Sequence, residues 1–236
     1  MKKFFITFSA LVMSLTLAAQ PKPQHVVVLG DDPTMVADEA ANAAGYASLL
    51  APLFDEAVSV DVYASATLLP ADADALLEHA GKGDIALLCK LPVEETVENM
   101  TMSDIYLNQL TAIAQAAKKK GVKIVWLTPV CPRYFTAEGK QVHRSGMYPD
   151  IVRRMCQRDG LPIVDVEMLT FNRLAQAGAE ASASDYVPLT ANVPAAEEKA
   201  AREGLLLTEV GAQQVAELIG DAIRADKKNP LNKRMK

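Results

Sequence analysis

The chain has 236 residues, half of them hydrophobic, and a formal net charge of −5 at neutral pH. This length allows one domain with a substantial core, and the mild acidity argues against a nucleic-acid-binding protein, which needs a basic surface. The basic residues are dispersed, apart from a Lys triplet at 118–120 and a basic C-terminal segment.

Residues 1–20 have the pattern of a bacterial export signal. Two lysines precede an apolar stretch at 4–17, and the small residues before Gln20 suit cleavage. The apolar stretch is too short for a comfortable membrane span. We therefore expect a mature chain without a membrane span, either periplasmic or secreted.

Behind this leader, short apolar runs alternate with longer amphipathic ones. The apolar runs predict strands and the amphipathic runs predict helices. The predicted strands cover 26–29, 58–63, 85–89, 122–127 and 162–164. The predicted helices cover 37–54, 70–79, 103–120, 148–158, 167–177 and 208–225.

This alternation predicts a parallel sheet covered on both faces, in one doubly wound α/β domain at 21–225. Segment 226–236, which contains Pro230 and several basic residues, is expected to be a flexible basic tail. In such sheets ligands bind at the carboxyl ends of the strands, so the residues that follow each strand are the candidates for a site.

The three cysteines, Cys89, Cys131 and Cys156, lack the paired spacing of a metal site. We expect no metal and no cofactor, although the carboxylates of Asp31, Asp32 and Glu203 would together also be able to bind a cation. A disulfide between two of them is compatible with export, but the sequence does not choose the pair.

Three blocks of the sequence resemble those of the SGNH/GDSL hydrolases, especially the rhamnogalacturonan acetylesterase branch. The first block, 25–35, is a strand that runs into Gly-Asp. The second, 126–135, contains Thr-Pro-Val and is followed by Gly-Lys at 139–140 and Tyr-Pro at 148–149. The third, 206–212, opens the last helix with Thr-Glu-Val-Gly-Ala.

The resemblance implies a flavodoxin-like three-layer α/β/α sandwich with a five-stranded parallel sheet. It also implies an esterase that removes acyl groups, often acetyl groups from plant cell-wall sugars. In that family a Ser attacks the ester, a His three residues after an Asp takes its proton, and Gly and Asn groups stabilise the oxyanion.

The catalytic positions of the family hold other residues in this chain. The nucleophile position is Asp32, the His position is Leu206, and the Asp position is Glu203. The Gly-x-Asn-Asp block is replaced by Cys-Lys-Leu-Pro at 89–92, and no glycine follows the second strand. A Leu accepts no proton, so the general base is missing.

The leading hypothesis is therefore a catalytically inactive relative that keeps a crevice for a cell-wall or pectic glycan, or for a partner protein. The crevice residues expected on this hypothesis are Asp31, Asp32, Arg133, Tyr134, His143 and Glu203. A second hypothesis is an active hydrolase with a rebuilt centre of Asp32, Glu203 and His143. A third is a protein-binding module with an exposed apolar patch.

Each candidate also has a plain structural interpretation. Asp31 caps its turn, and Asp32 before a proline is a common turn dipeptide. His143 is a solvated or structural loop residue. On the same interpretation, Arg133 is expected to pair with a local carboxylate and Phe135 to belong to the core.

Overall fold

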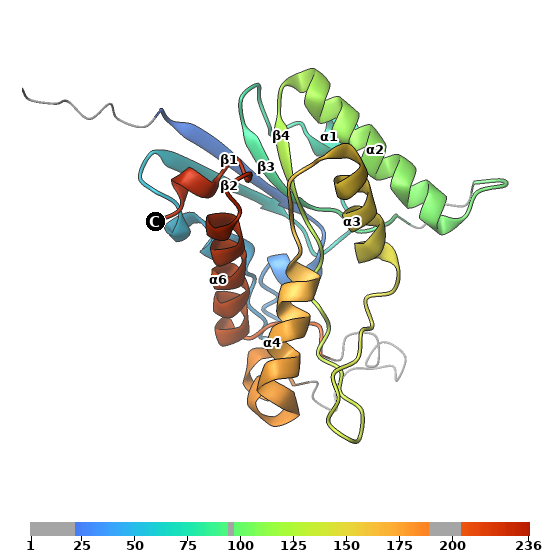
Figure 1. The fold of residues 1–236 in the computed structure, drawn as a ribbon, viewed down its shortest axis with the longest axis vertical. Helices are drawn as coiled ribbons and strands as arrows, with labels where there is room; N and C mark the ends of the chain where they lie inside the picture. Colours follow the sequence, from blue (N-terminus) through green and yellow to red (C-terminus); the bar gives the residue numbers. More distant parts are fainter. Residues whose placement is uncertain (1–21, 94–96, 189–203) are drawn as a thin grey trace, which may run out of the picture.

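The structure is a computed structural model, and it describes residues 22–93, 97–188 and 204–236 (Figure 1). Five parallel strands form one sheet in the order β2-β1-β3-β4-β5. They are β1 (Gln24–Gly30), β2 (Val58–Ala64), β3 (Ile85–Cys89), β4 (Lys123–Leu127) and β5 (Ile163–Val164). This is the flavodoxin-like order, and it confirms the expected fold class.

Helices cover both faces of the sheet (Figure 1). The α-helices are α1 (Ala73–Leu76), α2 (Met102–Lys120), α3 (Tyr148–Asp159), α4 (Val166–Ala181) and α6 (Glu209–Ala225). The short 3-10 helices are η1 (Pro33–Met35), η2 (Ala47–Leu49), η3 (Ala51–Leu53), η4 (Ser182–Asp185) and η5 (Asn232–Arg234). Among the described residues no helix is both long and apolar enough to cross a membrane.

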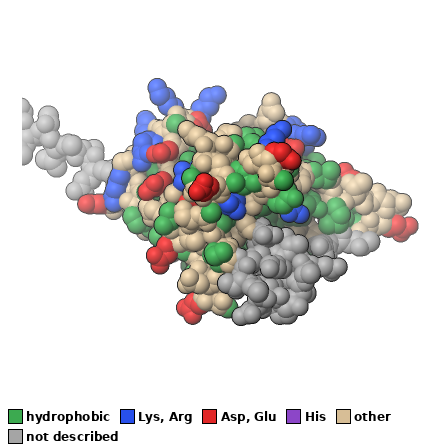
Figure 2. All heavy atoms as spheres, turned by 90° about the horizontal axis from the view of Figure 1, so that it is seen from below, with side chains coloured by type: hydrophobic (Ala, Val, Ile, Leu, Met, Phe, Trp, Pro, Cys, Tyr) green, Lys and Arg blue, Asp and Glu red, His purple; other side chains and the backbone are tan. Residues whose placement is uncertain are grey.

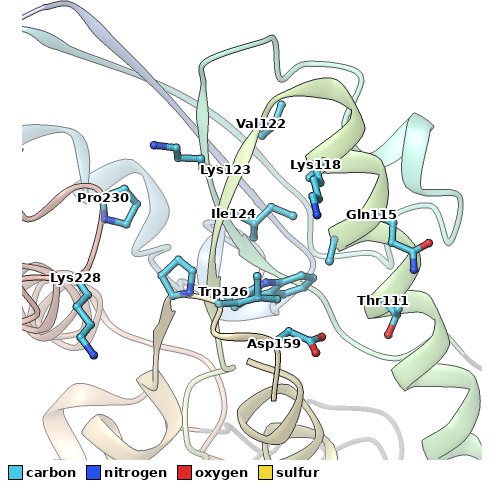
Figure 3. A pocket seen from close by; sticks show the side chains of 14 residues that line it. Thr111, Gln115, Lys118, Val122, Lys123, Ile124, Trp126, Asp159, Lys228 and Pro230 are labelled. Atoms are coloured by element: carbon cyan, nitrogen blue, oxygen red, sulfur yellow. The ribbon is translucent and has the colours of Figure 1, made fainter. Parts of the chain in front are cut away.

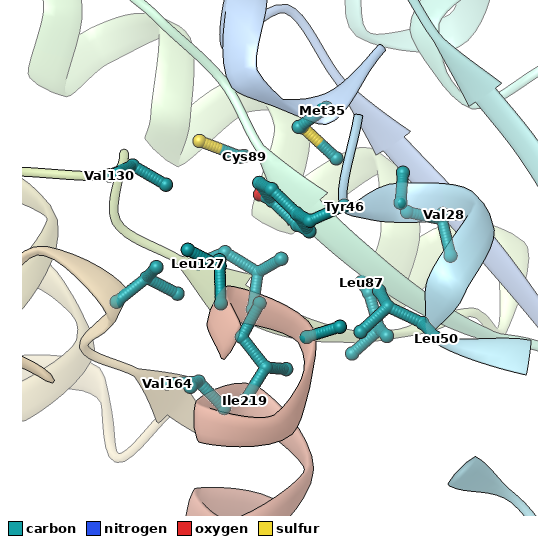
Figure 4. Close-up of a cluster of buried hydrophobic side chains, with 14 of the residues drawn as sticks. Val28, Met35, Tyr46, Leu50, Leu87, Cys89, Leu127, Val130, Val164 and Ile219 are labelled. Carbon is teal, nitrogen blue, oxygen red and sulfur yellow. The ribbon is translucent and has the colours of Figure 1, made fainter. Parts of the chain in front are cut away.

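The alternation of side chains along the strands divides the core into two clusters. Val26 and Val28 of β1 pack with α6, α4 and the segment of η2 and η3, whereas Val27 and Leu29 pack with α1, α2 and α3. Figure 4 shows the first cluster, in which Tyr46 lies among buried aliphatic side chains. Each fully buried aliphatic side chain contributes about 1.5–3 kcal/mol, so both layers anchor the sheet.

Helix α2 shows how local sequence sets the boundaries. Thr101 accepts a hydrogen bond from the N–H of Asp104, and the Asp104 carboxylate accepts from the N–H of Thr101, which forms a capping box. The helix ends at Gly121, whose φ of 77° suits a glycine. The helix predicted at 103–120 therefore begins one residue earlier than expected, after the cap at Thr101.

The predicted helix at 37–54 is absent from the structure. The segment is a loop with two 3-10 turns, in which Asn42 has a φ of 52°. A Cβ on Gly45 would lie 2.4 Å from the carbonyl carbon of Val36, so the backbones touch there. This close approach inserts Tyr46 into the core and overrides the helical pattern. The predicted helix at 70–79 shrinks to the four residues of α1.

The C-terminal segment 226–236 also differs from the flexible tail expected. Leu231 is fully buried, and Met235 forms a β-bridge with Phe54. The N–H of Asp55 donates to the carbonyl of Arg234 at 2.7 Å. The apolar side chains among the basic ones attach this segment to the rest of the domain.

Candidate functional site at the carboxyl edge of the sheet

The turn after β1 depends on Gly30. A Cβ at this position would lie 2.2 Å from Sδ of Met35 and 2.8 Å from the carbonyl oxygen of Cys89. Only glycine fits, so the chain turns directly after the strand. The turn places Asp31 and Asp32 at the carboxyl edge, where the resemblance expects the nucleophile.

Asp31 is part of a buried ion pair with Lys90. Oδ2 lies 2.5 Å from the Nζ of Lys90, and both side chains are fully buried. The backbone N–H groups of Leu69 and Leu91 donate to the same carboxylate at 3.0 and 2.5 Å. Lys90 also donates to the carbonyl of Leu91 at 2.8 Å. The carboxylate of Asp31 is therefore bound by groups of the protein itself.

Asp32 is 1% exposed and joins two loops. Its Oδ1 accepts from the N–H and the hydroxyl of Thr34 at 2.9 and 2.8 Å, and its Oδ2 accepts from the N–H of Val130 at 2.9 Å. Burial raises the pKa of Asp32, although these hydrogen bonds oppose the rise. The geometry is that of a cap on η1 with a second contact to the loop after β4.

Position 206, where the family has its histidine, holds a leucine that is buried in the protein. Leu206 is 4% exposed, and its carbonyl accepts from the N–H of Val187 at 2.9 Å. A Cβ on Gly211 would lie 1.9 Å from the carbonyl oxygen of Asp185, which explains the glycine of this block. Glu203, the third candidate, lies outside the described residues.

His143 contacts Glu167. Its Nδ1 lies 2.8 Å from Oε1 of Glu167, and its ring stacks on Phe171 with the centroids 3.6 Å apart. The imidazole is 49% exposed, whereas the Glu167 side chain is 2% exposed. Glu167 lies in the first turn of α4, where acidic residues are common in helices, so no sequence pattern marked it.

Glu167 also belongs to a network around Arg153. The guanidinium reaches Oε2 of Glu167 at 2.5 Å and both oxygens of Asp165 at 2.7 and 2.8 Å. Burial would raise the pKa of Asp165, but the hydrogen bonds and charge of Arg153 outweigh it and lower that pKa. Thr128 donates to Asp165 at 3.0 Å and links the network to β4.

Arg133 is held by hydrogen bonds within the protein, whereas the side chain of Tyr134 is exposed. Arg133 donates to the hydroxyl of Ser182 at 3.1 Å and to the carbonyl of Ala179, instead of the expected carboxylate. Tyr134 is 42% exposed, and the guanidinium of Arg144 lies 4.4 Å from its ring centroid. Phe135 packs against the core, in agreement with its structural interpretation.

The three cysteines are free and buried in the structure, so the possible disulfide is not formed. Cys131 follows β4 and lies near Gln141, whose amide approaches Sγ at 3.7 Å. Burial, together with the charge of Glu167, raises the pKa of Cys131 to about 12. The thiol is therefore protonated at neutral pH.

A separate groove of about 560 Å³ lies at the beginning of β4 (Figure 3). Ile124 and Trp126 contribute to its apolar lining, and Lys118 and Lys228 stand at its sides. Because β4 begins there, the groove is away from the carboxyl edge. The face seen in Figure 2 carries acidic and basic side chains interspersed.

Comparisons with known proteins agree with this architecture. No family model matches the chain. The chain is 26% identical over 211 residues to a curated rhamnogalacturonan acetylesterase of Bacillus subtilis, covering 86% of this chain and 90% of that protein.

Solved structures share the fold. A Bacillus subtilis protein superposes with a TM-score of 0.65 at 16% identity, covering 86% of this chain and 56% of that one, so this chain spans about half its length. A putative GDSL-like lipase from Parabacteroides merdae gives 0.53 at 15% identity, with 85% and 95% covered. An acetyl-xylooligosaccharide esterase variant from Geobacillus gives 0.52 at 12% identity, with 87% and 96% covered. The chain therefore has the fold of these hydrolases and is similar in sequence to a rhamnogalacturonan acetylesterase.

Proposed function

We propose that the chain is an exported, catalytically inactive relative of the carbohydrate acetylesterases that binds a pectic or other cell-wall glycan at the carboxyl edge of its sheet. The observation that carries the proposal is the burial and hydrogen bonding of the Asp32 carboxylate. A nucleophile must reach the substrate, but this carboxylate is 1% exposed and both of its oxygens accept hydrogen bonds.

Other features of the edge support the loss of catalysis. Leu206 supplies no general base. Lys90 stands in the block that carries the family's oxyanion Asn, and its ammonium is engaged by Asp31. His143 directs Nδ1 at Glu167, which is not a residue of the rebuilt centre.

The proposed glycan contact is the hairpin at 133–147. An antiparallel bridge between Phe135 and Gln141, with a hydrogen bond from the N–H of Val142 to the carbonyl of Tyr134 at 3.0 Å, orders it. Tyr134 is exposed, and aromatic rings offer sugars an apolar face with a polar edge. Arg144, exposed beside that ring, suits the carboxylates of pectic chains.

Export is part of this proposal because a cell-wall glycan lies outside the cytoplasm. Its support is the leader pattern at 1–20, which lies outside the described residues.

The first test is acetate release by the purified mature chain from acetylated rhamnogalacturonan and xylan oligosaccharides. We expect none above buffer for the wild type or for Asp32→Ala. Release by the wild type that disappears in Asp32→Ala would overturn the proposal in favour of a rebuilt esterase centre.

The second test is calorimetric titration with deacetylated pectic oligosaccharides. We expect Tyr134→Ala to weaken binding about 2- to 10-fold, the scale of one aromatic contact. Tyr63→Ala is the matched control, because Tyr63 is similarly exposed (38%) but lies on β2 and stacks on His79. Equal losses in both variants, or no binding by the wild type, would refute the glycan site.

A further inference from the structure

Three side chains that can ligate a metal converge beside the carboxyl edge. One donor atom each from Cys131, His143 and Glu167 lies within 4.8 Å of the other two. They come from three separate segments: the loop after β4, the hairpin, and the start of α4. Their spacing in the sequence matches no metal motif, which is why the sequence predicts no metal here.

We propose that Cys131, His143 and Glu167 form a binding site for one divalent transition-metal ion of the Zn²⁺ type. Thiolate, imidazole and carboxylate together are the donor set that proteins use for zinc. Three protein ligands leave a fourth tetrahedral position for water or another small ligand.

The separations are compatible with one ion after small side-chain movements. With zinc–ligand distances of about 2.0–2.3 Å, donor atoms in a tetrahedral site lie about 3.3–3.6 Å apart. Nδ1 of His143 and Oε1 of Glu167 are 2.8 Å apart, so this pair opens slightly. The thiol of Cys131, whose Sγ lies within 4.8 Å of the other two donor atoms, closes by up to about 1.2–1.5 Å. His143, half exposed, has room for the adjustment.

The surrounding contacts hold the ligands in place. Arg153 engages Oε2 of Glu167, whereas Oε1 faces the imidazole and also accepts a hydrogen bond from the hydroxyl of Ser145 at 3.1 Å. Phe171 stacks on the ring of His143 and fixes its plane. Outer contacts of this kind orient the ligands of established metal sites.

The backbone of Cys131 is fixed as well. Its N–H donates to the hydroxyl of Thr170 at 2.9 Å, and its carbonyl accepts from the hydroxyl of Tyr186 at 2.9 Å. A bound ion would therefore join a fixed loop, a fixed helix start and the hairpin. It would clamp the base of the hairpin to the domain.

The test uses the full mature chain, freed of metal with a chelator and titrated with Zn²⁺ against a chromophoric indicator. We expect one ion per chain and a rise in melting temperature, because an ion that binds only the folded state stabilises it. Titration with Co²⁺ should give a thiolate-to-metal charge-transfer band. Absence of stoichiometric binding would overturn the proposal.

The variants assign the ion to these residues. His143→Gln and Cys131→Ser should each weaken Zn²⁺ binding more than about 100-fold, beyond the loss from an outer contact, and Cys131→Ser should abolish the charge-transfer band. The matched controls, His79→Gln and Cys156→Ser, should bind as the wild type does. If Cys131→Ser fails to fold, the half-exposed His143→Gln decides alone. Wild-type affinity in His143→Gln would refute the site.

Discussion

Replacing Lys90 with methionine should destabilise the fold strongly. The substitution keeps much of the side-chain volume but leaves the Asp31 carboxylate fully buried with only the N–H groups of Leu69 and Leu91. Breaking a buried pair by removing one partner costs about 3–5 kcal/mol, because an uncompensated charge remains. This is a large part of the 5–15 kcal/mol that stabilises a typical domain.

The measurement is urea unfolding followed by circular dichroism. With a slope of about 2–3 kcal/mol/M, the midpoint should fall by about 1–2.5 M. The double variant Lys90→Met, Asp31→Asn should lose much less than the sum of the two single variants, because neither charge is left alone. A fall below about 0.3 M in Lys90→Met would mean that water reaches the pair, and the reasoning would be wrong.

Three further results are expected. Gly211→Ala should lower the free energy of unfolding by about 1–3 kcal/mol, because its Cβ would clash with the backbone of Asp185. The control Gly81→Ala should be nearly neutral, because its Cβ meets nothing closer than 3.4 Å. Equal unfolding midpoints in the two variants would contradict this reasoning. A hydrogen bond to Asp84 raises the pKa of His25 above its ordinary value of 6.5. The protonated His25 therefore stabilises the fold fully below pH 6.5, and this contribution is lost as the pH rises through the folded-state pKa. The decline in the free energy of unfolding amounts to at most about 1 kcal/mol for such a partly exposed pair, and His25→Gln should flatten it. An unchanged pH profile of stability would refute the assignment. In the metal-free chain a thiol reagent should modify no cysteine until denaturant is added, because all three are buried.

The sheet was predictable because most of its strands contain a continuous apolar run, whereas β2 alternates apolar and polar residues. Residues 85–89 match β3 at both ends, and the helices at the second half of the chain lie within a few residues of their prediction. The segment 37–54 was not predictable in this way, since its path goes with tertiary backbone contacts such as the β-bridge of Ala44 with Leu207. Such a contact is set by the whole fold and leaves no periodic pattern.

The site was predictable only in part, for a similar reason. The positions of Asp32 and Leu206 followed from motifs with fixed order along the chain. Glu167 has no motif and acquires its partners, Arg153 and His143, only when α3, the hairpin and α4 meet. Lys90 was visible as a substitution, but its pairing with Asp31 required the alignment of β1 beside β3.

The two hydrogen-bonded oxygens of Asp32 determine what a serine at position 32 would cost. One carboxylate oxygen holds Thr34 and the other holds Val130, and a serine hydroxyl has a single oxygen. Restoring serine at position 32 would leave one buried N–H without an acceptor, at a cost of about 1–3 kcal/mol. On the proposed function, in which Leu206 supplies no base, that change alone brings no activity in return. Under the same proposal, the first step toward a serine nucleophile would make the chain less stable before it could make it active.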